Sequence, residues 1–289
     1  MKIAASELIL NPDGSVYHLH LQPGQVADTV ITVGDSDRVA EITKHFDAIE
    51  FTTQNREFKT QTGTYKDKRI TVISTGIGTD NIDIVLNELD AVVNINLKTR
   101  EIKRDITSLD IIRIGTSGSI SDTIALDSFV VSKMAIGFDS VLHFYANGAV
   151  QELDAAKSFI QHTGWFTKKS APYIISADAA LAEKFSSSRT KSGITATNVG
   201  FYGPQGRVLR LPLQDPDLNS KLATFTYKDL FITNMEMETA GIYGLSKLLG
   251  HKAVSLNAII ANRVSGAFSM NPAKVVEELI QYALACIIK

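Results

Sequence analysis

Three arginines lie in short polar segments whose residue types are those that bind oxyanions. Arg38 ends the segment GDSDR, Arg56 lies in NREF, and Arg113 begins RIGTSG. Guanidinium groups pair with phosphate through two parallel hydrogen bonds, and the backbone N–H groups of glycine turns add further donors. Three arginines on separate segments suit a trivalent oxyanion, so the sequence predicts a phosphate site. Each segment taken alone is also typical of a structural turn.

A further glycine segment, TGIG at 75–78, tests whether the ligand is a nucleotide cofactor. The third glycine of a dinucleotide fingerprint would fall at position 81, which is Asn81. The chain also contains no Gly-Lys-Ser/Thr phosphate loop and no Gly-x-Ser-x-Gly nucleophile elbow. These absences favour a free oxyanion as ligand.

Two glutamates stand two residues apart in the segment NMEMETAG. In an extended chain Glu236 and Glu238 share one face, and Met235 and Met237 share the other. Carboxylates accept hydrogen bonds from sugar hydroxyls, so the segment predicts a sugar site. The alternative is a helix N-terminus, which favours negative charge. A metal site is disfavoured because no histidine lies close to these glutamates in the sequence.

The segment GFYGPQGR is predicted to be a loop from its glycine and proline content. It carries Phe201, Gln205 and Arg207, which are suited to stack on a planar heterocycle and to pair with its edge. A plain polar loop is the alternative. Two other reactive residues are interpreted as structural: His18 alternates with hydrophobic residues, and Cys286 lies on a predicted C-terminal helix.

Composition excludes several classes of protein. The chain has 289 residues, 44% of them hydrophobic, and a formal net charge of −2. A general nucleic-acid binder needs an excess of Lys and Arg, and a disordered chain needs low hydrophobicity with high net charge. The single cysteine excludes an intrachain disulfide framework. No apolar run suits a membrane span or a signal peptide, so we expect a soluble, cytoplasmic protein that binds neither nucleic acid nor membrane.

The elements that must position these residues are short apolar strands alternating with helices. The expected strands span residues 29–33, 70–74, 110–114, 129–131, 194–198, 231–233 and 254–261. The expected helices span 38–46 and 82–89, and a third begins at Asn271-Pro272. The pattern predicts an α/β fold with a central mixed β-sheet flanked by helices, in a single domain spanning 1–289. Ligands of such folds bind at the carboxyl ends of the strands. The polar segment 92–108 is interpreted as a solvated excursion or, alternatively, as a subunit contact.

The ordered set of motifs resembles the nucleoside phosphorylase superfamily. Six motifs, individually weak, occur in the family's order across most of the chain: VGDSDR, REF, STGIG, RIGTSG, NMEME and ANR. Within the superfamily the chain is most similar to the uridine phosphorylases. The pair Gln205 and Arg207 matches a Gln-x-Arg pattern that reads the uracil edge, and Asn262 stands where purine enzymes usually place an aspartate.

The resemblance implies a pentosyltransferase that catalyses the reversible phosphorolysis of uridine to uracil and ribose 1-phosphate, in nucleoside salvage. It implies inorganic phosphate as co-substrate and no required cofactor. The alternatives are a purine nucleoside phosphorylase, a nucleosidase that uses water, and a nucleoside-binding protein without turnover.

The resemblance also implies roles for individual residues. Phosphate would be bound by Gly34, Arg38, Arg113 and Thr116, the ribose by Glu238, Met237 and Glu236, and the base by Phe201, Gln205, Arg207, Ile260 and Ala261, with Arg263 supporting the base loop. Among these, the resemblance implies that the catalytic residues are Arg113, Gln205, Arg207 and Glu238.

Self-association and a cation site follow from the same resemblance. The active site would be shared across a dimer interface, with Arg56 and His18 contributed by the neighbouring subunit. An interface potassium ion would be held by Glu57, Ile70 and Ser74.

Overall fold

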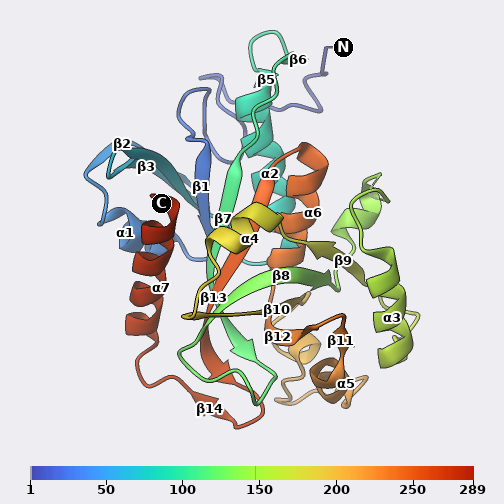
Figure 1. The fold of residues 1–289 in the computed structure, drawn as a ribbon. Coiled ribbons are helices and arrows are strands. Elements are labelled where there is room, and N and C mark those ends of the chain that lie inside the picture. The colour runs from blue at the N-terminus through green and yellow to red at the C-terminus, as the bar shows by residue number, and fades with distance from the viewer. Residues whose placement is uncertain (1, 147) are drawn as a thin grey trace.

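The computed structural model describes residues 2–146 and 148–289 and is built around a twelve-stranded mixed sheet (Figure 1). The strands are β1 (Thr29–Val33), β2 (Ala48–Asn55), β3 (Phe58–Tyr65), β4 (Lys68–Ser74), β5 (Ile95–Asn96), β6 (Glu101–Ile102), β7 (Asp110–Ser119), β8 (Phe129–Gly137), β9 (Tyr173–Ser176), β10 (Thr190–Thr197), β11 (Thr226–Tyr227), β12 (Leu230–Glu236), β13 (Lys252–Asn262) and β14 (Ala267–Phe268). The helices are α1 (Ser36–Thr43), α2 (Thr79–Asn94), α3 (Leu153–Thr163), α4 (Ala179–Lys184), α5 (Leu218–Thr224), α6 (Thr239–Leu249) and α7 (Pro272–Ile287), with 3₁₀ turns at Val141–Phe144 and Gly203–Gln205.

The centre of the sheet is parallel and buried on both faces. β1 pairs in parallel with β4 and β7, and β7 pairs in parallel with β13. All five residues of β1 are buried, as expected for a strand covered by helices on both sides. In Figure 1, α1 and α7 lie on one side of these strands and α2 and α6 on the other. The predicted α/β fold with a mixed sheet flanked by helices is therefore confirmed.

The second half of the sheet closes on itself. The order β7–β13–β8–β10–β12 returns to β7, because β12 also pairs antiparallel with the end of β7. Asn234 and Met235 on β12 lie opposite Ser119 and Gly118 on β7. The closure brings the NMEME segment against the RIGTSG segment, which are distant in the sequence.

One predicted turn is in fact a strand. Residues 115–118 were expected to leave the sheet after residue 114, whereas β7 continues to Ser119 and pairs with β13 along its length. Gly115 lies within β7, next to the side chain of Arg113. A Cβ atom at this position would lie 2.0 Å from Nη1 of Arg113, so the glycine leaves room for that guanidinium group.

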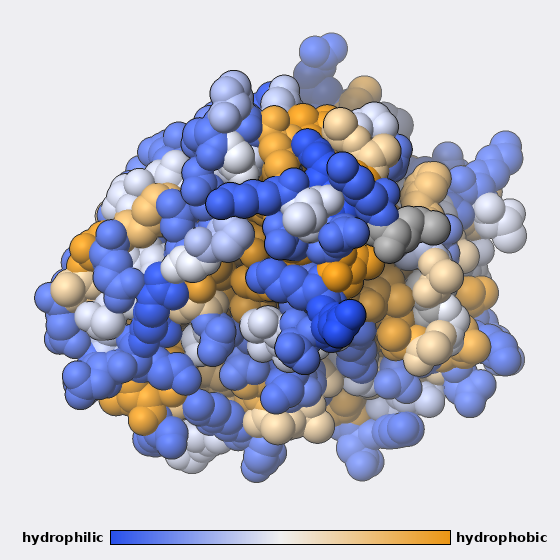
Figure 2. All heavy atoms as spheres, turned by 90° about the horizontal axis from the view of Figure 1, so that it is seen from above, coloured by the Kyte–Doolittle hydropathy of each residue, from blue (hydrophilic) through white to orange (hydrophobic). Residues whose placement is uncertain are grey.

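Segment 92–108 contains the end of α2 and a small hairpin. The strands β5 and β6 pair with each other, and Lys2 forms an antiparallel bridge to Glu101. Figure 2 views the molecule from this end, where hydrophilic side chains cover much of the surface and hydrophobic groups gather in patches between them. Among the described residues, no helix is long and apolar enough to cross a membrane.

Candidate active site

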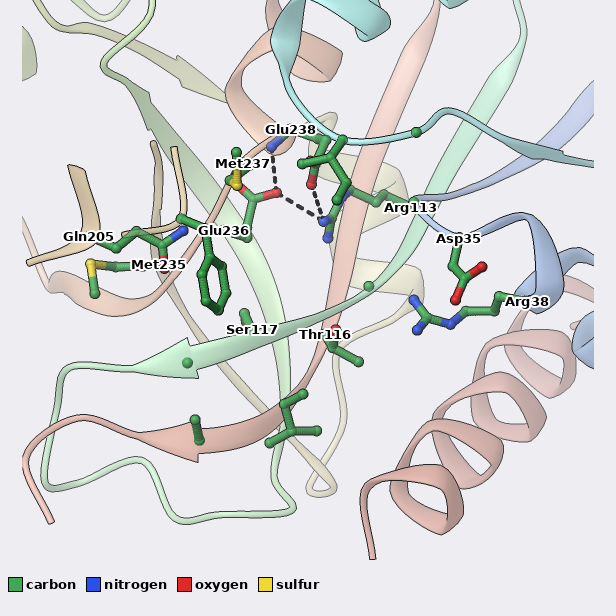
Figure 3. A pocket seen from close by; sticks show the side chains of 18 of the residues that line it. Asp35, Arg38, Arg113, Thr116, Ser117, Gln205, Met235, Glu236, Met237 and Glu238 are labelled. Carbon is green, nitrogen blue, oxygen red and sulfur yellow. Dashed lines mark hydrogen bonds and ion pairs between the residues drawn. The ribbon is translucent and has the colours of Figure 1, made fainter. Parts of the chain in front are cut away.

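A cavity of about 710 Å³ lies where β1, β4, β7, β12 and β13 end. Its lining includes these residues that the sequence singled out: Gly34, Arg38, Glu57, Arg113, Thr116, Phe201, Gln205, Arg207, Glu236, Met237, Glu238, Ile260 and Ala261. Figure 3 shows Arg38 and Asp35 at one side of the cavity, Gln205 and Met235 at the other, and Arg113 with the two glutamates between them. We call the part formed by Gly34, Arg38, Arg113 and Thr116 the anion end, and the part formed by Phe201, Gln205 and Arg207 the loop end.

Arg38 supplies a cation at the anion end whose one ion pair, with Glu41, is long at 3.9 Å. It lies in the first turn of α1, directly after the Asp35 N-cap, whose side chain accepts a hydrogen bond from Asp37 N. Arg38 Nε is buried and has no hydrogen-bond partner among the described residues. Burial lowers the pKa of Arg38, and the positive charge of Arg113 lowers it further while Glu41 opposes the shift. A buried donor near a second guanidinium is an arrangement that an anion would stabilise.

Arg113 is the buried charge of the anion end and lies beside the two glutamates (Figure 3). Its Nη2 lies 2.5 Å from Glu238 Oε2 and 3.2 Å from Glu236 Oε2, and its Nη1 donates to Asn257 Oδ1 at 2.9 Å. Burial alone would lower the pKa of Arg113, but the carboxylates of Glu236 and Glu238 outweigh burial and raise it. Arg113 is therefore held as a fixed cation.

The two glutamates have different surroundings. Glu236 Oε2 accepts hydrogen bonds from the backbone N–H groups of Glu238 and Thr239, and its Oε1 accepts from Thr197. Its acceptor capacity is largely used within the chain, so it chiefly anchors Arg113. Glu238, the N-cap of α6, accepts from Gly78 N at 2.9 Å in addition to its contact with Arg113.

The ionisation of Glu238 reflects its burial. Burial raises the pKa of its carboxyl group, Arg113 lowers it, and Glu236 raises it, with a net upward shift.

The backbone shows which of the two interpretations of the segment NMEMETAG applies to each glutamate. Glu236 ends a strand, and Glu238 begins a helix. A carboxylate that leaves the sheet at this point lies within the cavity (Figure 3).

The loop end is held together by its own side chains. Arg207 Nη1 donates to Gln205 Oε1 at 2.7 Å and to the carbonyl of Phe201 at 2.5 Å, and its guanidinium lies 3.7 Å from the centre of the Phe201 ring. Burial lowers the pKa of Arg207, and the charge of Arg263 lowers it further. Arg263 lies behind the loop and donates to the carbonyls of Gln205 and Gly206.

Beside Arg263, which supports the loop, two residues predicted to reach the sugar and the phosphate lie outside this cavity. His18 Nδ1 is 2.6 Å from Glu88 Oε1, in a smaller hollow beside α2. Arg56 is exposed at the turn between β2 and β3 with a φ of 54°. Asn55 Nδ2 donates to the His18 carbonyl at 2.8 Å, so the two segments are in contact. Neither residue reaches the cavity of its own chain.

Of the three residues expected to hold potassium, Glu57 and Ser74 are in contact and Ile70 lies apart. Ile70 and Ser74 are four steps apart on one strand, a separation of about 13 Å. Ile70 is buried, and Ser74 Oγ donates to the Glu57 carbonyl and accepts from Lys59 N. Within residues 2–146 and 148–289 there is also no cluster of three His, Cys, Asp or Glu side chains suited to a metal ion. The potassium ion was expected at an interface between subunits, and that site stays a prediction.

Sequence reasoning missed several residues of the site. Ser117, Met235 and Phe268 line the cavity, and Asn257 fixes Arg113 from the middle of β13. Ser117 lay in a segment already recognised for phosphate. Asn257 lies in the largely apolar run 253–261, which also contains Ser255, and an amide side chain in such a run is the signal that could have identified it.

Comparisons with known proteins agree with this geometry. A model of the phosphorylase superfamily matches residues 28–287. A uridine phosphorylase of Thermococcus kodakarensis is 29% identical over 276 residues, covering 92% of this chain and 84% of the relative. A purine nucleoside phosphorylase of Vibrio cholerae is 26% identical over 240 residues, covering 83% of each chain.

A solved structure extends the likeness to the fold. The crystal structure of a Trypanosoma brucei nucleoside phosphorylase, described as showing uridine phosphorylase activity, superimposes with a TM-score of 0.86 at 28% identity. It covers 96% of this chain, and the match includes 99% of that structure. The chain therefore belongs to the phosphorylase superfamily, as a nucleoside phosphorylase close to uridine phosphorylase, and is a pentosyltransferase that uses phosphate as co-substrate.

Proposed function

We propose that the protein catalyses the reversible phosphorolysis of uridine to uracil and ribose 1-phosphate, a reaction of nucleoside salvage. The observation that carries the proposal is a single cavity with two arginines at one end, a buried carboxylate in the middle and an aromatic–amide–guanidinium loop at the other. This order matches phosphate, ribose and planar base. We take residues 1–289 as one nucleoside phosphorylase-like domain, because strands from β1 to β13 contribute to the cavity.

The anion end would hold the nucleophile. Phosphate bound by Arg38, Arg113 and Thr116 would lie beneath C1′ of the sugar. As the bond between C1′ and N1 breaks, its electron pair leaves with the base, and a phosphate oxygen forms the new bond to C1′. The sugar passes through a state that resembles an oxocarbenium ion, which the adjacent phosphate stabilises. No enzyme nucleophile is needed.

The middle of the cavity and the loop end would hold the nucleoside. Glu238 would accept from the ribose hydroxyls, with Met237 packed beside the sugar. Phe201 would stack on the uracil ring, with Ile260 and Ala261 lining the pocket. Gln205 and Arg207 would stabilise the negative charge that develops on the leaving base.

The surroundings of Asn262 favour a pyrimidine over a purine. Its Nδ2 donates to the carbonyls of Ser121 and Ile124, and its Oδ1 accepts from Val264 N and Ser265 N. The side chain is thus committed to the backbone and does not line the cavity. A residue with these contacts cannot protonate a purine ring from this position.

We also propose that a second copy of the chain completes the site. His18 and Arg56 lie on joined segments at the surface, outside their own cavity. Together they would reach the sugar and the phosphate of the neighbouring subunit. Mixing Arg56→Ala with Arg38→Ala protein should restore activity, because hybrid dimers contain one site in which neither arginine is missing. No recovery on mixing would remove Arg56 from the shared site.

The function is tested by following uridine cleavage by ultraviolet absorbance, in phosphate and in phosphate-free buffer, with inosine in parallel. We expect release of uracil only with phosphate, and a higher kcat/KM for uridine than for inosine. Cleavage without phosphate would indicate a nucleosidase, and preference for inosine would indicate a purine enzyme. Tight binding with no base release would indicate a protein without turnover.

A further inference from the structure

Ser117 lines the cavity beside the loop end and has none of the roles described above. It is buried on β7, one residue beyond Thr116, and Figure 3 shows it on the same side of the cavity as Gln205 and Met235. Its neighbours in this part of the lining are chiefly apolar. A hydroxyl group among apolar side chains is a directional feature, because its free energy depends on finding a hydrogen-bond partner.

The orientation of this hydroxyl is set by a buried amide. Asn234 is fully buried on β12, and its Nδ2 donates to Ser117 Oγ at 2.9 Å. The amide is itself fixed, since its Oδ1 accepts from Thr195 Oγ1 at 2.9 Å and from Thr233 Oγ1 at 2.8 Å. The hydroxyl of Ser132 lies 2.5 Å from Thr195 Oγ1 and extends the network away from the cavity.

This network determines whether Ser117 Oγ can donate a hydrogen bond to a ligand or only accept one. An amide nitrogen has no lone pair to offer, so Ser117 Oγ is the acceptor in its bond with Asn234. Among the hydrogen bonds formed by the described residues, none has Ser117 Oγ as donor. Its hydrogen is therefore free for a ligand in the cavity, and the matching ligand group is an acceptor.

The loop end has the same preference for acceptors. Arg207 already donates to Gln205 Oε1, whereas the side-chain N–H groups of Gln205 donate to none of the described residues. Two neutral donors thus come from β7 and from the loop. Of the parts of a pyrimidine nucleoside, only the base offers several acceptors in one plane, namely its ring carbonyl oxygens.

We propose that Ser117 donates a hydrogen bond to a ring carbonyl oxygen of the pyrimidine base, and that Asn234 is the positioning residue that makes it a donor. This inference rests on the proposed function and adds a specificity-determining residue to it. The carbonyl oxygens gain negative charge as the base leaves, so the bond strengthens towards the transition state. Its loss should therefore lower kcat more than it raises KM for the nucleoside.

The test measures kcat and KM for uridine, 2-thiouridine and 4-thiouridine with wild type, Ser117→Ala and Ser117→Thr. With uridine we expect Ser117→Ala to lower kcat/KM about tenfold, the effect of one neutral hydrogen bond, and Ser117→Thr to retain most of the activity. Sulfur is a weak acceptor. The loss should accordingly shrink to about twofold for the thionucleoside whose sulfur replaces the contacted oxygen, and stay near tenfold for the other.

Asn234→Asp tests the positioning role. A carboxylate accepts from Ser117 and turns its hydrogen away from the cavity, so the variant should show the same substrate pattern as Ser117→Ala, with the phosphate KM unchanged. Ser119→Ala is the matched control, because this buried serine lies on the same strand, donates to the Thr233 carbonyl and does not line the cavity. It should leave the ratio between uridine and the thionucleosides unchanged.

The outcomes separate this inference from the function on which it rests. Wild type that leaves uridine intact would overturn the proposed function, and with it the pyrimidine as the ligand of Ser117. Wild type that cleaves uridine, with Ser117→Ala fully active or equally impaired on all three nucleosides, would overturn the role of Ser117 alone. An Asn234→Asp variant with the wild-type pattern would remove Asn234 as its positioning residue.

Discussion

The anion end and the loop end of the cavity are held by different kinds of structure. At the anion end, Arg113 lies on a central strand and is fixed by two buried carboxylates and Asn257. At the loop end, Gln205 and Arg207 lie between β10 and α5, and Arg207 fixes the loop by bonding to its neighbours. A charge built into the sheet supports both folding and catalysis, whereas a charge on a loop can serve catalysis alone.

The largest effect is expected from Arg113→Ala. Removing the cation leaves the buried carboxylates of Glu236 and Glu238 without a positive charge beside them, which should lower the free energy of unfolding by about 3–5 kcal/mol. We also expect kcat/KM to fall by at least about 10³, because the variant loses a phosphate ligand and the support of Glu238. Urea denaturation and steady-state kinetics measure the two effects.

Arg38→Ala is the matched control for this prediction. Arg38 has no carboxylate within hydrogen-bond distance, since Glu41 Oε2 lies 3.9 Å from its Nε. Its removal should raise the phosphate KM and change the free energy of unfolding by less than about 1 kcal/mol. Arg113→Ala protein as stable as wild type would contradict the view that this end of the cavity is part of the folded core.

Arg207→Ala should affect activity without affecting stability. We expect kcat/KM for uridine to fall by about 10²–10³, the usual effect of removing one preorganised donor, with an unchanged melting temperature. Arg210→Ala, on an exposed arginine of the same loop, is the control and should resemble wild type. A main effect on the phosphate KM would place Arg207 at the wrong end of the cavity.

The sequence was informative wherever function follows from the type of a residue and its place after a strand. The strand at 29–33 was predicted with its observed bounds, and Arg38, Arg113 and Glu238, which were predicted to share one site, line the same cavity. Arg38 follows β1, Glu238 follows β12 and Arg113 lies within β7. Neighbouring strands of the sheet bring these positions together.

What the sequence could not show depends on contacts between distant segments. The pairing of β12 with β7 creates the contact between Asn234 and Ser117. No local sequence pattern predicts this pairing. The extension of β7 through Gly115 was missed because glycine and serine are typical of turns. The potassium residues were assigned by resemblance alone; Glu57 and Ser74 lie in contact, and the interface site stays a prediction.

A smaller effect is expected from Arg263→Ala, which tests how far the loop depends on its support. Arg263 donates to the carbonyl of Gln205 at 3.1 Å and to that of Gly206 at 3.2 Å. Loss of these bonds should raise the KM for uridine about tenfold and leave the phosphate KM unchanged. Hydrogen exchange of residues 199–216 should become faster, and unchanged exchange would show that the loop is held by other contacts.

The smallest effect concerns the titration of Glu238, the carboxylate that lies between the two ends. Burial raises the pKa of this group in the folded protein. A raised folded pKa means that ionisation weakens the folded state, so stability is lost as pH rises from the unfolded pKa through the folded one. Glu238→Gln has no such titration. The melting temperature of the variant minus that of wild type should therefore increase as the pH is raised from about 4. Scanning fluorimetry measures this difference, and a difference that decreases instead would show that Arg113 outweighs burial at Glu238.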